Sequence, residues 1–208
     1  MTAILTNLRN AVIAGFVLAA ILLVLYATAW GGAFDKPFWA FLFRWLHVIS
    51  GVMWIGLLWY FNFVQIPTMP KIPDEQKPAI GKHIAPEALF WFRWAAMATI
   101  VTGLILAFLN NYLLQVITLG ATESFAVPGH TAIGIGMWLG AIMWFNVWFV
   151  IWPNQQKALN IGNKFPDIAA DAKAKAARMA MLFSRTNTVL SVPMLFAMVS
   201  AQSLFHIS

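Results

Sequence analysis

The stretch that decides the fold is "FRWLHVISGVMWIGLLWYF", residues 43–61. It has the length and apolar character of a membrane-spanning helix, which needs about 20 residues. It nevertheless contains Arg44 and His47. Ionisable side chains are costly in hydrocarbon and commonly mark a functional site. His47 lies four residues before Gly51 and seven before Trp54, and this spacing is where the functional prediction begins.

The composition of the whole chain is that of an integral membrane protein. Of its 208 residues, 61% are hydrophobic and 10% are charged, and the mean hydropathy is +0.75. Soluble domains carry about 25% charged residues, so this chain lacks the polar surface that water requires. The net charge of +6 does not indicate a nucleic-acid partner, because the Lys and Arg residues cluster in two loops and are better explained by membrane orientation.

The absence of cysteine excludes several kinds of site. The chain cannot form disulfides, thiolate metal sites or a cysteine nucleophile, and without C-x-x-C-H it cannot attach a c-type haem covalently. The first apolar segment, residues 11–30, is too long for a signal-peptide core, so we expect a retained span.

Five apolar segments are long enough to cross a bilayer. They predict an all-α, polytopic helical bundle that forms a single transmembrane domain over residues 1–208. The segments lie near residues 10–30, 38–66, 88–114, 130–153 and 179–206. The Ala- and Lys-rich sequence after Asp167 favours helix, so we expect the fifth helix to begin outside the membrane.

The basic residues predict the orientation of the bundle. Eleven of the thirteen Lys and Arg residues fall on the side of the N-terminus and of the loops 67–87 and 154–178, and only Lys36 and Arg44 fall on the other. Positive residues concentrate on the cytoplasmic side of membrane proteins. The chain is therefore predicted to be a multi-pass membrane protein with its N-terminus in the cytoplasm and its C-terminus on the opposite side.

Two histidines share a local pattern in parallel helices. "HVISG" in the second span and "HTAIG" in the fourth both place glycine four residues after histidine. His47 lies twenty residues before Pro67, and His130 lies twenty-three before Pro153. If both prolines mark the cytoplasmic helix ends, the two histidines differ in depth by about 5 Å and lie in the outer half of the membrane.

This arrangement predicts a haem b site with His47 and His130 as its two iron ligands. Gly51 and Gly134 lie on the histidines' faces and remove bulk where a flat macrocycle would lie. His206, near the C-terminus, is an alternative second ligand, and a frayed terminus is the competing explanation of this residue.

Two further side chains are candidates for the same site. Arg44, one turn outward from His47, matches the geometry of a haem propionate, and Trp54 would pack on the macrocycle. The competing interpretation is structural, because a lone intramembrane histidine often bonds a neighbouring helix and glycine often marks close helix packing.

Other polar residues inside the spans allow two interpretations. They either line a polar cytoplasmic cavity, or the arginines extend to the interface while Asn62 and Asn146 bridge helices. The residues concerned are Tyr60, Asn62, Arg93, Asn146, Arg185, Asn187 and Ser191.

Four ordered motifs resemble the membrane domain of the bacterial membrane-bound urate oxidases, also called urate hydroxylases. They are "HVISGVMWIGLLWYFNFVQ", "PEALFWFRWAAMATIVTG", "IMWFNVWFVIWPNQQ" and "SRTNTVLSVPMLFAM". The H-x6-W-x-G pattern at His47, Trp54 and Gly56 is also similar to haem-binding membrane proteins of the protoporphyrinogen-oxidase type. The resemblance implies a multi-span domain of the bacterial inner (cytoplasmic) membrane, with a periplasmic C-terminus, that works with an extracytoplasmic cytochrome c. Because this chain has no C-x-x-C-H, we expect any such cytochrome to be a separate partner.

These observations predict a membrane redox protein that passes electrons toward a periplasmic cytochrome c. If the chain is an enzyme, the resemblance implies an oxidoreductase similar to membrane-bound urate oxidase. The alternative is a non-catalytic accessory or structural subunit of a larger membrane complex, whose aromatic and glycine-rich faces contact lipid and other membrane subunits. Transport or copper handling ranks last, because the spans lack paired carboxylates or a Met/His ladder.

Overall fold

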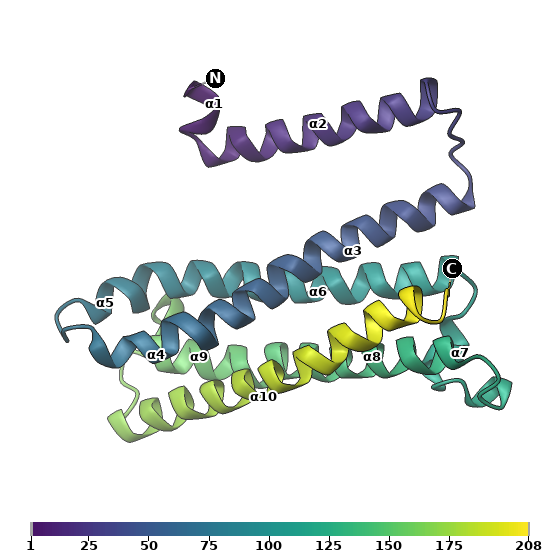
Figure 1. The fold of residues 1–208 in the computed structure, drawn as a ribbon. Coiled ribbons are helices and arrows are strands. Elements are labelled where there is room, and N and C mark those ends of the chain that lie inside the picture. The colour runs from purple at the N-terminus through teal and green to yellow at the C-terminus, as the bar shows by residue number, and fades with distance from the viewer. Residues whose placement is uncertain (1, 208) are drawn as a thin grey trace. The chain divides into compact units, whose positions relative to one another are not determined.

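The structure, a computed structural model, describes residues 2–207. Every regular element in this range is helical, which confirms the all-α prediction (Figure 1). Five helices are long and apolar enough to cross a membrane, as the sequence predicts. They are Leu8–Thr28, Lys36–Lys71, Lys77–Leu109, Pro128–Leu159 and Ala170–Ser203.

The long helices are built from α-helical segments joined by π-helical turns. The α-helices are α1 (Thr2–Leu5), α2 (Leu8–Thr28), α3 (Lys36–Trp59), α4 (Ile66–Thr68), α5 (Lys77–Ala79), α6 (Ala85–Leu109), α7 (Leu113–Ile117), α8 (Pro128–Phe145), α9 (Trp152–Leu159) and α10 (Ala170–Ser203). The π-helical turns are η1 (Tyr60–Gln65), η3 (Ile80–Ile84) and η5 (Asn146–Ile151), and the 3-10 turns are η2 (Met69–Lys71), η4 (Ala121–Glu123) and η6 (Ile161–Asn163). The predicted third span extends too far, because α6 ends at Leu109 and Asn111 turns the chain with a φ of +60°.

Contacts group the chain into two units, Met1–Leu42 and Phe43–Ser208. In the first unit the ring of Tyr26 stacks on Phe38 at 5.7 Å between centroids. The Tyr26 hydroxyl also donates a hydrogen bond to the carbonyl of Ala33 at 3.1 Å. The organisation of residues 1–208 as one transmembrane domain stays a prediction.

The second unit is a helical bundle in which α10 packs along α8, η5 and α9, while α6 contacts α7, α8 and η5 (Figure 1). Its hydrophobic core takes side chains from α3, α6, α8 and α10 and from two π turns. The buried members are Trp54, Ile55, Leu58, Phe61, Leu89, Phe92, Ala95, Ala96, Met143, Val147, Ile151 and Met194.

Proline explains where the π turns occur. Pro67, Pro86 and Pro153 each lie two residues after a π turn ends. Proline has no N–H to donate, and its ring crowds the carbonyl four residues earlier, which lies inside the π turn in all three cases. A wider helical turn relieves that crowding. The three prolines therefore change the direction of the helices at one end of the bundle.

Small residues let the helices approach closely, as expected within a membrane. A Cβ built on Gly136 in α8 would lie 3.2–3.3 Å from the side chains of Met198 and Ala197 in α10. Glycine at this position therefore fixes the spacing of α8 and α10, which form two walls of the site described next.

Candidate functional site

A cavity of about 880 Å³ lies between α3, α6, α8 and α10 of the second unit. Its walls come from residues 44–59, 99–107, 133–144 and 194–203, with Tyr112 and α7 closing one side. Cofactor sites commonly have volumes of about 300–1,000 Å³ and mostly apolar walls, so this cavity has the size and character of one.

His47 is one of the wall residues of this cavity. Its Nδ1–H donates a hydrogen bond to the backbone carbonyl of Thr99 at 2.9 Å, with the Thr102 hydroxyl at 3.4 Å. A carbonyl can only accept, so Nδ1 carries a proton, and in the neutral imidazole Nε2 then keeps its lone pair. Histidines that bind metals are usually oriented by such a bond from the other ring nitrogen.

Glycine creates the space for His47. A Cβ on Gly103 would lie 2.9 Å from Cε1 and 3.1 Å from Nδ1 of His47, so only glycine lets the imidazole reach Thr99, one turn earlier on α6. By contrast, a Cβ on Gly51, Gly56 or Gly140 would meet no atom within 4 Å. These three glycines lie in the cavity wall and leave it open.

Three N–H donors of wall residues lack partners. They are Nε of Arg44 and Nε1 of Trp54 and Trp144, all buried. No described carboxylate pairs with Arg44, because the salt bridges in residues 2–207 are Lys77–Asp74 and His130–Glu123. Buried donors without acceptors are unfavourable, so the wall chemistry suits a ligand that brings acceptor oxygens.

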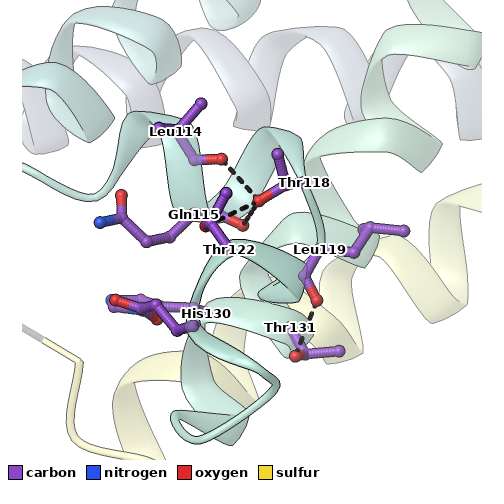
Figure 2. A network of polar contacts seen from close by, with 8 residues as sticks. Leu114, Gln115, Thr118, Leu119, Thr122, His130 and Thr131 are labelled. Atoms are coloured by element: carbon purple, nitrogen blue, oxygen red, sulfur yellow. Dashed lines mark hydrogen bonds and ion pairs between the residues drawn. The ribbon is translucent and has the colours of Figure 1, made fainter.

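His130 lies near this cavity but is not part of its wall. Its Nδ1 is 2.6 Å from a carboxylate oxygen of Glu123, and its ring packs on Tyr112 at 5.7 Å between centroids. Tyr112 does line the cavity. Figure 2 shows His130 beside the α7–η4 segment, where the Thr131 hydroxyl donates to the carbonyl of Leu119 at 2.9 Å.

Gly134 serves close packing at the same end of α8. Its Cβ would lie 2.6 Å from the carbonyl oxygen of Val116 and 3.2 Å from Leu119. The space beside Gly134 is therefore filled by α7 and the turn after it, whereas the space beside Gly51 is open.

The structure thus brings Arg44, His47, Gly51 and Trp54 together in one wall and leaves His130 and Gly134 outside it. His206 is exposed near the C-terminus. No group of three His, Asp or Glu side chains in residues 2–207 is arranged to hold a metal ion.

Sequence reasoning missed Thr99, Gly103 and Trp144, which complete the surroundings of His47. A weak signal was present, because Gly103 follows Thr99 by four residues, the spacing by which Gly51 follows His47. Nothing in the sequence indicates which glycine would face the imidazole.

The buried asparagines bridge helices, as the second interpretation predicted. Asn146 donates through Nδ2 to Oδ1 of Asn187 at 2.8 Å, and Asn187 donates to the carbonyl of Met143 at 2.9 Å. Asn62 donates to the Ser184 hydroxyl at 2.8 Å. A buried polar stripe on α10 links this helix to α3 and α8. Its members are Ser184, Asn187 and Ser191.

A second cavity, of about 230 Å³, lies at the end of the bundle that carries the π turns. Its polar wall residues are Gln65, Gln155 and Ser184. None of the seven polar residues predicted to line a cytoplasmic cavity is among its wall residues. The three asparagines among them bridge helices instead.

The fold and the larger cavity together define a class of protein: a helical bundle suited to a membrane, with a largely apolar cavity that has a histidine in its wall. Residues 107–207 match the protein family described as "Urate oxidase N-terminal". This match confirms the resemblance over α7, α8 and α10, and it includes the motifs "IMWFNVWFVIWPNQQ" and "SRTNTVLSVPMLFAM". The searches of curated proteins and of solved structures found no match.

Proposed function

We propose that this chain is a membrane redox protein that binds haem b in the larger cavity through Nε2 of His47. The observation that carries the proposal is the bond from His47 Nδ1 to the Thr99 carbonyl, because it leaves a neutral, fixed Nε2 without a hydrogen-bond partner in the described chain. When bound, haem b supplies one-electron chemistry.

The residues of the cavity wall are chemically suited to haem b. Gly51, Gly56 and Gly140 leave flat, open surfaces, and Trp54 and Trp144 offer aromatic faces. The unpaired guanidinium of Arg44 matches a carboxylate, so a propionate is the acceptor that this residue lacks. Burial and the hydrogen bond to His47 would tune the potential.

His130 remains the predicted second ligand. Its Nδ1 is held by Glu123, which leaves its Nε2 free in the same way as that of His47. To reach the cavity, its imidazole must pass Tyr112, on whose ring it packs. The family resemblance and the charge asymmetry favour electron transfer toward a cytochrome c on the periplasmic side.

The proposal is tested by absorption spectra of the purified full chain, oxidised and reduced, after expression with adequate haem. We expect a b-type spectrum that is lost in His47→Ala. His83→Ala is the matched control, because His83 is exposed in η3, does not line the cavity and should leave the spectrum unchanged.

A wild-type protein without a Soret band, or an unchanged spectrum in His47→Ala, would refute the proposal. A colourless but stable protein would instead support the alternative of an accessory subunit. His130→Ala decides the second ligand separately: loss of the low-spin spectrum supports its role, and an unchanged spectrum removes it.

A further inference from the structure

A second arginine with a buried, unpartnered Nε lies outside the larger cavity, at the end of the bundle that carries the π turns. Arg93 of α6 places its guanidinium carbon 3.8 Å from the ring centroid of Trp152 and 5.0 Å from that of Trp148. Trp94 is a third neighbour, at 5.7 Å. These contacts hold the planar guanidinium by its faces, which leaves the N–H groups around its edge for a ligand.

The polar atoms of this Arg93–tryptophan cluster lack partners. Nε of Arg93 and Nε1 of Trp148 are both buried and without a hydrogen bond. Neither of the salt bridges in the described chain involves Arg93. Other tryptophans do find acceptors: Trp91 donates to Glu87 and Trp59 donates to Ser191, each at 3.0 Å. The side chain of Arg93 is only partly exposed, so an anionic acceptor that approaches from its exposed side would stabilise the charge.

The position of the cluster indicates where that acceptor comes from. Arg93 lies seven residues after Pro86, roughly 10 Å along the helix, and Trp152 directly precedes Pro153. If the proline-bearing helix ends mark the membrane surface, both residues lie within about 10 Å of it. Tryptophan concentrates in this interfacial region, and arginine side chains extend to it. Trp94, 5.7 Å from the guanidinium carbon, is 46% exposed, so an apolar surface continues beside the cation.

We infer that Arg93 and Trp148 form a binding site for the phosphate group of an anionic phospholipid in the leaflet facing the basic loops. The guanidinium edge would bind phosphate oxygens, and the indole N–H would join it after a small shift of the Trp148 side chain, while Trp94 would contact the acyl chains. A free phosphate shares the oxygen chemistry but gains nothing from the apolar surface. The inference does not depend on haem binding.

Native mass spectrometry of the full chain tests this site. The probes are phosphatidylglycerol, phosphatidylcholine with the same acyl chains, and inorganic phosphate. We expect wild type to retain phosphatidylglycerol in preference to the other two. Arg93→Gln should weaken that retention about tenfold, the value expected for losing one hydrogen-bonded charge. Trp148→Phe, which keeps the ring and removes the N–H, should weaken it by a smaller factor.

Arg185→Gln is the matched control, because Arg185 lies on α10 in the same half of the bundle but is exposed and has no aromatic partner in the described structure. It should retain phosphatidylglycerol as wild type does. Equal losses in Arg93→Gln and Arg185→Gln, or no loss in Arg93→Gln, would overturn the inference, as would equal retention of inorganic phosphate. If Arg93→Gln does not fold, Trp148→Phe becomes the decisive variant. Unchanged retention of phosphatidylglycerol by Trp148→Phe would then refute the site.

Discussion

At the scale of single residues, the orientation of the His47 imidazole depends on the absence of a Cβ at Gly103 of α6. The missing side chain of Gly103 allows the imidazole to lie against α6 and to donate to Thr99. Gly51 has a different role, because the space beside it is open and no neighbouring side chain fills it. Two glycines in one cavity wall therefore predict opposite responses to the same substitution.

We expect Gly103→Ala to destabilise the haem-free protein by about 1–3 kcal/mol, the usual cost of overpacking, because its Cβ would lie 2.9 Å from the His47 ring. Gly51→Ala should be neutral or stabilising by up to about 1 kcal/mol, since alanine favours helix and meets no atom within 4 Å. Reversible unfolding in detergent measures both. Equal effects of the two substitutions would contradict this assignment of the glycines.

At the scale of elements, polar side chains and prolines decide how the helices join. The π turns precede prolines. The stripe on α10 bonds to Trp59 at the end of α3 and to Asn62 and Asn146 in the π turns η1 and η5. Asn187 is central to this stripe, because it accepts from Asn146 and donates to the carbonyl of Met143. Its side chain is fully buried, so no water can replace either partner.

Asn187→Leu is expected to lower the free energy of unfolding by about 1–2 kcal/mol, since it removes two hydrogen bonds and leaves the Asn146 donor unsatisfied. Thr186→Leu is the control, because Thr186 is exposed and bonds only within α10. Unfolding in detergent compares the two. A loss no greater for Asn187→Leu than for Thr186→Leu would show that the bridge contributes nothing.

At the scale of the whole molecule, the loops carry the information about orientation. The natural sequence has no cysteine, so single introduced cysteines report their side of the membrane without background. Lys164 lies in a basic loop and Thr122 lies in η4 near the other ends of α6 and α8, and both are exposed.

In intact cells we expect a membrane-impermeant maleimide to label Thr122→Cys and not Lys164→Cys, which should react only after permeabilisation. The reason is the excess of Lys and Arg in the loop that contains Lys164, which favours retention in the cytoplasm. Labelling of Lys164→Cys alone in intact cells would reverse the orientation, and the proposed electron transfer to a periplasmic cytochrome c would then fail.

The sequence alone determined the five helices and the placement of His47, Gly51 and Trp54 on one helix face. Both follow from local quantities, the length of an apolar run and the 3.6-residue period of a helix. It predicted equally well that His130 and Gly134 share a face of their helix, but it could not place that face relative to the cavity.

The tertiary structure alone decided which residues from different helices meet. Thr99 and Gly103 lie more than fifty residues from His47, and Tyr112 lies between the cavity and His130. The physical reason is that helix contacts depend on crossing angle and distance of approach, which small residues and proline-linked turns on several helices set together. The period of one helix contains no information about the position of its neighbours.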